Sequence, residues 1–155
     1  MTVAGIALAA GLAACGGSDP EGVEPETISK DEYVRRADVI CTDVRRRLRP
    51  LGKDKSRAFP VIYREASARA RLHTEKLVLL RDIDQPDSDS DALDSYLDDV
   101  EAVAVAERQV AASAVTKNLD VVRGQEKDRD EAAERETASA RAFGFRVCGL
   151  ERVAR

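Results

Sequence analysis

The chain has 155 residues, of which 43% are hydrophobic and 35% are charged, and it contains no tryptophan. This length predicts a single compact domain, and the scarcity of aromatic residues (4%) favours packed helices over a β-sandwich. The formal net charge of -4 arises from 25 basic and 29 acidic residues spread along the chain, which argues against a nucleic-acid partner.

The first segment, residues 1–14, contains an apolar run that is too short to cross a bilayer and suits the hydrophobic region of a signal peptide. The sequence LAACG at 12–16 resembles the lipobox of bacterial lipoproteins. That resemblance implies cleavage before Cys15 and attachment of lipid to its thiol, so that acyl chains hold the protein to a membrane. The alternative is a buried alanine-rich helix, which is disfavoured by the GGSDP sequence that follows.

The second segment, residues 15–28, is rich in glycine, proline and acidic residues and offers little apolar surface to bury. It is expected to be a flexible tether, and about a dozen such residues reach on the order of 20 Å. The remaining residues, 29–155, are expected to fold as a helical domain. We therefore expect this domain on the extracytoplasmic face of the cell membrane, held there by lipid.

If Cys15 carries the lipid, Cys41 and Cys148 remain as a pair in an oxidising compartment. We therefore expect them to form one disulfide. Its role is expected to be structural and not catalytic, because no C-x-x-C motif is present. Such a bridge closes a loop of about a hundred residues and contributes roughly 4.7 kcal/mol in the chain-entropy model. The alternative is two separate buried thiols.

The first helix is expected to begin after Ser29, because Ser29 and Glu32 have the spacing of a capping box. It is expected to end before Pro50. Its core face, with Cys41 at the edge, follows the helical spacing of Tyr33, Ala37, Ile40, Val44 and Leu48. The opposite face carries six arginines, Arg35, Arg36, Arg45, Arg46, Arg47 and Arg49. We interpret this face as solvated and partly paired with acids. Contact with anionic lipid headgroups is the alternative.

The second helix is expected to start at Pro60, which suits a first turn, and to end near Ile83. Its apolar positions are Ile62, Ala66, Ala70, Leu77 and Leu80. The single histidine, His73, lies in this helix without the Glu-x-x-His spacing of di-iron bundles. We therefore expect no metal site, no catalytic residue and no cofactor.

Residues 87–98 have the alternating acids of an EF-hand calcium loop. Ala92 replaces the glycine of that motif, and Asp98 replaces its bidentate glutamate. The pattern therefore favours an acidic loop before a third helix, with Asp89 or Ser90 as its N-cap. Calcium binding in this loop is the alternative.

The third helix is expected to end near Asn118, and Leu93, Leu97, Val100 and Ala104 keep its helical phase. It is expected to continue through Glu107, Val110, Ala111, Ala114 and Val115, with enough alanine for neighbouring helices to approach closely. The fourth helix is expected to start near Leu119 or Val122 and to continue through a charged stretch, part of which is expected to fray. A kink and a stop around Cys148 are expected at Gly144 and Gly149.

The lipobox, the early helical cysteine in ADVICTDV (37–44) and the terminal FGFRVCGL (143–150) together resemble small actinobacterial lipoproteins of uncharacterised function. The resemblance implies a helical bundle clamped by a disulfide, but no activity and no site. Composition and periodicity independently predict an all-α fold, an antiparallel bundle of about four helices. One disulfide is expected to join the first helix to the C-terminal segment.

The leading functional hypothesis is a binding or interaction module of the cell envelope. Its partner is expected to be another envelope protein or a small ligand held between the helices. The alternative is a structural or stress-related envelope protein without a specific ligand. Catalysis is disfavoured, because the sequence has no Ser/His/Asp order, no glycine-rich phosphate loop and no metal-ligand spacing.

Overall fold

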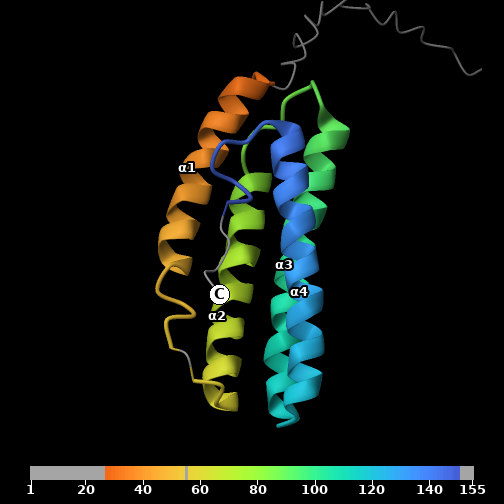
Figure 1. The fold of residues 1–155 in the computed structure, drawn as a ribbon. Coiled ribbons are helices and arrows are strands. Elements are labelled where there is room, and N and C mark those ends of the chain that lie inside the picture. Colours follow the sequence, from red (N-terminus) through yellow and green to blue (C-terminus); the bar gives the residue numbers. More distant parts are fainter. Residues whose placement is uncertain (1–26, 55, 151–155) are drawn as a thin grey trace, which may run out of the picture.

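The computed structural model describes residues 27–54 and 56–150, which form four helices and no strand. The helices are α1 (Lys30–Leu48), α2 (Phe59–Arg81), α3 (Ser90–Val115) and α4 (Leu119–Phe143). They run alternately up and down (Figure 1). The all-α antiparallel bundle expected from the sequence is therefore confirmed. The signal peptide, Cys15 and all but the last two residues of the expected tether lie outside the described residues.

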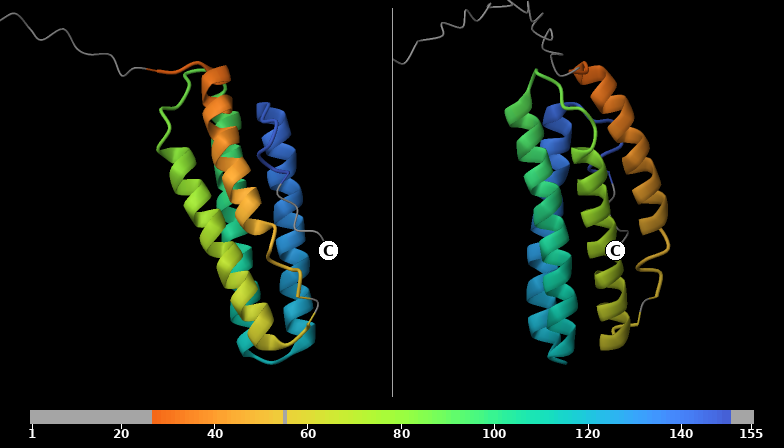
Figure 2. Two further views of the ribbon diagram at one scale, coloured as in Figure 1. Left: turned by 90° about the vertical axis from the view of Figure 1, so that its left-hand side faces the viewer. Right: turned by 180° about the vertical axis from the view of Figure 1, so that it is seen from behind.

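The helices α2, α3 and α4 form one layer, in which α3 packs against both α2 and α4. In the described part of the chain, the backbones of α2 and α4 do not contact each other. The shorter helix α1 packs on α2 and lies across the front of this layer (Figure 2, left). Below the end of α1, the α1–α2 loop crosses that front and leads to the start of α2 (Figure 2, left).

Local sequence signals explain most helix ends. Ser29 accepts a hydrogen bond from the Glu32 amide at 3.2 Å, as a capping residue does. The Glu32 carboxylate does not reach back to complete the capping box but accepts hydrogen bonds from Arg35 and Arg36. Asn118 caps α4, which continues without interruption through the charged stretch that was expected to fray.

The start of α3 was predicted correctly, but the expected capping bond is not formed by Asp89. Asp89 occupies the N-cap position with a positive φ of 62°, and its side chain makes no capping hydrogen bond. Its carboxylate instead pairs with Lys30 of α1 at 2.9 Å. The acidic loop therefore serves to join the start of α3 to the start of α1.

Two apolar clusters occupy opposite ends of the bundle. The upper cluster contains Leu80 and Leu93 together with the aromatic residues Tyr33, Tyr96, Phe143 and Phe145, which come from three helices and the C-terminal segment. Ile28, the last residue of the expected tether, also packs against it. The lower cluster is formed by small side chains of α2, α3 and α4, namely Ile62, Ala66, Val110, Ala111, Ala114 and Val122. Buried charged side chains lie between these two clusters.

The C-terminal segment after α4 folds back over the bundle and is fixed to α1. A disulfide joins Cys41 of α1 to Cys148, as predicted. Beside it, the carboxylate of Asp38 accepts a hydrogen bond from the Val147 amide at 2.9 Å. Gly149 has φ +76°, and a Cβ at this position would lie 2.7 Å from the Ala140 Cβ, so only glycine fits against α4.

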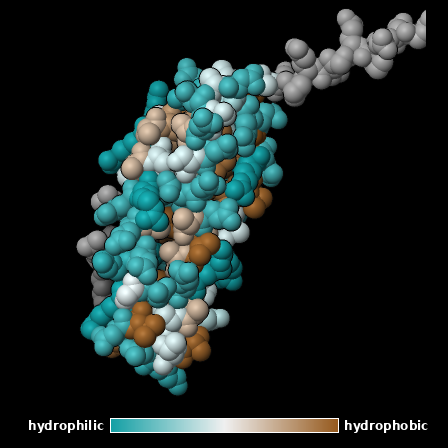
Figure 3. Space-filling model, turned by 90° about the vertical axis from the view of Figure 1, so that its right-hand side faces the viewer, coloured by the Kyte–Doolittle hydropathy of each residue, from teal (hydrophilic) through white to brown (hydrophobic). Residues whose placement is uncertain are grey.

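The arginine-rich face of α1 is largely paired with acids. Arg35 and Arg36 bind Glu32 within the helix. Arg47 binds Glu75 of α2 with two hydrogen bonds, and this contact lowers the pKa of Glu75. The interpretation of this face as solvated and partly paired therefore agrees with the structure. The side of the molecule that is turned away from α1 is also mostly polar, with exposed apolar residues scattered among hydrophilic ones (Figure 3).

Candidate functional site

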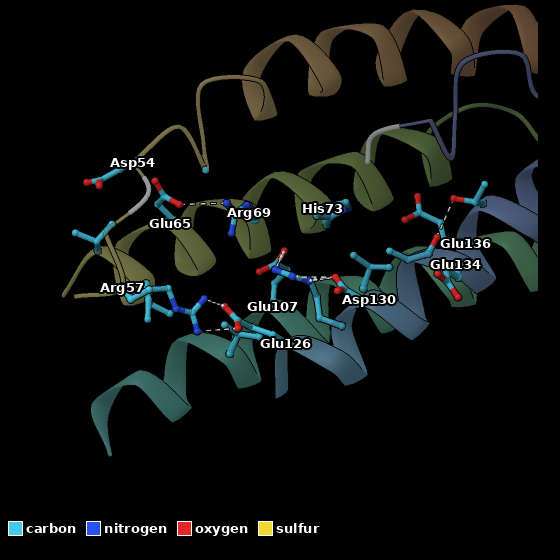
Figure 4. A pocket seen from close by; sticks show the side chains of 18 of the residues that line it. Asp54, Arg57, Glu65, Arg69, His73, Glu107, Glu126, Asp130, Glu134 and Glu136 are labelled. Atoms are coloured by element: carbon cyan, nitrogen blue, oxygen red, sulfur yellow. Dashed lines mark hydrogen bonds and ion pairs between the residues drawn. The ribbon is translucent and has the colours of Figure 1, made fainter. Parts of the chain in front are cut away.

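A pocket of about 530 Å³ opens between α2 and α4, with α3 as its floor (Figure 4). The α1–α2 loop borders one end of the pocket, and the C-terminal segment borders the other at Gly149. The pocket exists because α2 and α4 flank α3 without contact between their backbones. It lies between the two apolar clusters, where buried charged side chains stand among apolar ones such as Val103.

The floor of the pocket is formed by Glu107 of α3, whose relative exposure is only 1%. Burial raises the pKa of Glu107 from its ordinary 4.5 to about 7, although the positive charges of Arg129 and Arg69 oppose this effect. One carboxylate oxygen lies 3.7 Å from Arg129 Nη1. Within the described residues, the other oxygen, Oε2, has no hydrogen-bond partner.

Two residues of α2, Arg69 and His73, form the facing wall. Arg69 is 7% exposed and donates a hydrogen bond from Nη2 to Glu65 at 3.2 Å. Its Nε is buried and is not hydrogen-bonded by any described residue. His73 is 5% exposed and lies one turn further along the same wall. The wall therefore offers a buried guanidinium donor toward the same space as the Glu107 acceptor.

The inner end of the pocket is closed by contacts between α2, α4 and the C-terminal segment. Lys76 of α2 and Glu136 of α4 form a fully interior ion pair, with relative side-chain exposures of 0% and 4%. Thr137 donates a hydrogen bond to the Gly149 carbonyl at 2.8 Å. These contacts fix the separation between α2 and α4 at the closed end.

The outer end is closed by an ion pair between the α1–α2 loop and α4. Arg57 donates two hydrogen bonds to the Glu126 carboxylate, at 2.9 and 3.0 Å. This pair is partly exposed, with side-chain exposures of 50% and 23%. Because surface ion pairs contribute little free energy, this end of the pocket is the easier one to open.

The arrangement has the features of a binding pocket for a small polar molecule. Its volume lies in the range of small-molecule sites, and its polar groups converge from three helices. A ligand can donate a hydrogen bond to Glu107 Oε2 and accept one from Arg69 Nε. Each new hydrogen bond to a charged group is worth about 1.5–3 kcal/mol.

The residues singled out in the sequence are distributed in different parts of the molecule. His73 lines the pocket. The Cys41–Cys148 disulfide lies in the upper apolar cluster, where it is a structural cross-link. Cys15 lies outside the described residues. In the ranges that the structure covers, no group of three or more metal-binding side chains gathers, at the acidic loop 87–98 or elsewhere.

Sequence reasoning did not identify the buried charged residues as a site. The signal was present, since Arg69, His73 and Lys76 continue the helical spacing of the apolar residues that precede them in α2. Glu107 was expected only to lie within the third helix, without a place in the core or in a site. Charged residues at the helical spacing of an apolar stripe were the sequence feature that could have identified the pocket.

Searches with the chain against protein-family models, curated proteins and solved structures found no match. None of the helices in the described ranges combines the length and the low charge that a bilayer span requires.

Proposed function

We propose that this chain is a lipid-anchored, extracytoplasmic binding module that holds a small polar ligand in the pocket between α2, α3 and α4. The observation that carries the proposal is the state of Glu107. Its carboxyl group is almost completely buried, it faces the pocket, and its Oε2 lacks a hydrogen-bond partner among the described residues.

A buried polar group without a partner costs about 1–3 kcal/mol, and more when it is charged. Native proteins contain few such groups, and each one requires a physical explanation. A bound ligand supplies one for Glu107 and for Arg69 together, because both residues line the same pocket and each has a buried polar atom without a hydrogen-bond partner among the described residues. A purely structural bundle gains nothing from these charges, since apolar side chains at the same positions would fill the space at lower cost.

The proposed location depends on the two ends of the chain. The disulfide between Cys41 and Cys148 suits an oxidising compartment outside the cytoplasm. The lipobox-like sequence ending in Cys15 supports export and lipidation. With a tether that reaches on the order of 20 Å, the pocket would sample ligands close to the membrane surface.

The anchor is tested by the intact mass of the protein extracted from the membrane fraction of its source, measured without reducing agent. We expect a chain that starts at Cys15 and carries acyl chains, with a mass that rises by two hydrogens on reduction. An unprocessed chain with free thiols in the soluble fraction would remove the proposed anchor and location.

Ligand binding is tested by thermal unfolding of the disulfide-bonded protein against a panel of small amines, amino acids, sugars and carboxylic acids. We expect at least one class to raise the Tm of the wild type and to raise that of Glu107→Gln much less. Glu101→Gln makes the same chemical change on the exposed side of α3 and is the matched control. If no compound raises the Tm, or if Glu107→Gln responds fully, the binding function is wrong.

A further inference from the structure

The walls of the pocket carry more negative than positive charge. Seven carboxylates line it: Asp54, Glu65, Glu107, Glu126, Asp130, Glu134 and Glu136. Three guanidinium groups among the described residues line it: Arg57, Arg69 and Arg129. Even with the ammonium of Lys76 behind the wall, the described acids outnumber the described permanent cations. Because the low-dielectric walls of a cleft strengthen the field of the charges that line it, this excess of negative charge favours a positively charged ligand.

The positive groups of the pocket are already bound to acids. Arg57 is held by Glu126 through two hydrogen bonds. Arg129 lies 2.8 Å from Asp130 and 3.7 Å from Glu107. A negatively charged ligand would have to displace one of these pairs, and in exchange it would approach the excess carboxylates.

The negative groups are less completely paired. Glu107 lines the pocket, and its Oε2 is buried without a hydrogen-bond partner in the described residues. Glu134 borders the same pocket and forms no ion pair within the described ranges, and the ion pair of Asp54 with Arg64 is long, at 3.9 Å. Carboxylates therefore remain available at the floor and at both ends of the pocket.

We propose that the ligand of this pocket is a small organic cation that also carries an oxygen acceptor, as a basic amino acid does. Its ammonium or guanidinium group donates to Glu107 Oε2, and its oxygen accepts from Arg69 Nε. The inference rests on the proposed binding function and specifies the ligand class for the same pocket. A volume of about 530 Å³ accommodates a molecule of this size.

The test is isothermal titration of the mature, disulfide-bonded chain with L-arginine, L-lysine, spermidine, L-glutamine, L-glutamate and calcium chloride. It is performed at pH 8 and low salt, because Glu107 with its pKa of about 7 is then ionised. We expect L-arginine or L-lysine to bind with a Kd below about 1 mM. Spermidine, which has no oxygen acceptor, is expected to bind about tenfold more weakly, and the three remaining solutes are expected to give no saturable heat.

Two variants with matched controls locate the binding. Glu107→Gln keeps the shape of the side chain and is expected to raise the Kd of the basic amino acid by at least about tenfold. Glu101→Gln is expected to leave that Kd unchanged. Arg69→Lys keeps the charge but removes Nε. This variant is expected to weaken the binding of the basic amino acid but not that of spermidine. Arg71→Lys, on the exposed face of α2, is expected to leave the Kd of both ligands unchanged.

Several results overturn this inference. Equal binding of L-glutamate, L-glutamine or calcium would contradict the requirement for an organic cation, and so would binding that Glu107→Gln does not weaken. If neutral or acidic compounds alone bind, and Glu107→Gln abolishes their binding, the binding function stands and the ligand class is wrong. If nothing in either panel binds, both proposals fail.

Discussion

Lys76 and Glu136 form an interior ion pair between α2 and α4, two helices whose backbones do not meet in the described part of the chain. The pair therefore acts as a strut across the inner end of the pocket. It also continues the charged layer that separates the upper apolar cluster from the lower one. Its energetic consequences are specific enough to measure.

Removing one member of this pair is expected to cost much more than removing both. Lys76→Met alone leaves the Glu136 carboxylate buried without this ion pair and should lower the free energy of unfolding by about 3–5 kcal/mol. Glu136→Leu and the double variant complete the cycle, and the double variant should recover part of the loss, which gives an interaction energy of about 2–3 kcal/mol in urea unfolding.

The control cycle uses Lys127 and Glu131, which form an exposed i,i+4 pair on α4 at 3.6 Å. The same substitutions there should give an interaction energy of about 0.3–0.5 kcal/mol. Equal interaction energies for the two pairs would contradict the interior placement of Lys76 and Glu136.

The buried carboxyl of Glu107 is expected to make stability depend on pH. Its folded pKa of about 7 lies above the ordinary 4.5, so the folded state favours the protonated form. Its contribution is complete below about pH 4.5 and is lost as pH rises toward 7, by up to about 3 kcal/mol. Glu107→Gln should therefore become progressively more stable than the wild type between pH 4.5 and 7, with a constant difference above that range.

Chemical denaturation of both proteins at a series of pH values measures this difference. Glu101→Gln should show no such trend, because Glu101 is on the exposed side of the same helix. A difference between Glu107→Gln and the wild type that stays flat from pH 4.5 to 8 would exclude a raised pKa for Glu107.

The disulfide is expected to supply a large share of the stability of the domain. It links residues separated by 107 positions, and the chain-entropy model assigns about 4.7 kcal/mol to a loop of that size. Reduction should lower the urea midpoint accordingly. The variant in which both Cys41 and Cys148 are alanine should unfold like the reduced wild type and should not respond to reductant. An unchanged midpoint on reduction would show that the loop is constrained without the bridge.

Asp38 is expected to fix the C-terminal segment in addition to the disulfide. Its carboxylate accepts amide hydrogen bonds from Val147 at 2.9 Å and, more weakly, from Arg146 at 3.3 Å and Cys148 at 3.4 Å. Asp38→Ala should cost about 1.5–3 kcal/mol in urea unfolding. Asp94→Ala on the exposed face of α3 controls for the gain in helix propensity. If the two variants unfold alike, the Asp38 contacts contribute no net stability.

Local chemistry explains why the helices could be predicted closely. Ser29 caps α1, Pro60 lies in the first turn of α2, and Gly144 ends α4 with a positive φ of 107°. Each of these signals involves residues within one turn of the boundary. They do not depend on how the helices pack, so the sequence alone contains them.

Tertiary placement explains what could not be predicted. The expected stripe of α1 placed Ile40 inside with Cys41 at its edge, whereas Cys41 is fully buried and Ile40 is only partly buried. A small rotation of the helix decides between adjacent positions, and the disulfide sets that rotation. Asp89 likewise lost its capping role because Lys30, 59 residues away, binds its carboxylate.

The candidate site falls between these two cases. The helical phase of the buried positions runs through Arg69 and His73 in α2 and through Glu107 in α3. Only the packing of α2 and α4 on either side of α3 shows that these side chains meet at one pocket. The sequence alone indicates that a charged residue at the spacing of an apolar stripe lies on a buried helix face. Only the fold shows which residues lie beside it.

The central claim is that the charged layer between the two apolar clusters is a ligand site. Amide chemical-shift mapping of the isotope-labelled mature protein during titration with L-arginine tests it most directly. We predict saturable shifts that cluster on the pocket-facing parts of three helices, at 65–73, 103–110 and 126–137. Shifts scattered over the exposed acidic surface and never saturating, or no shifts at all, would contradict the claim.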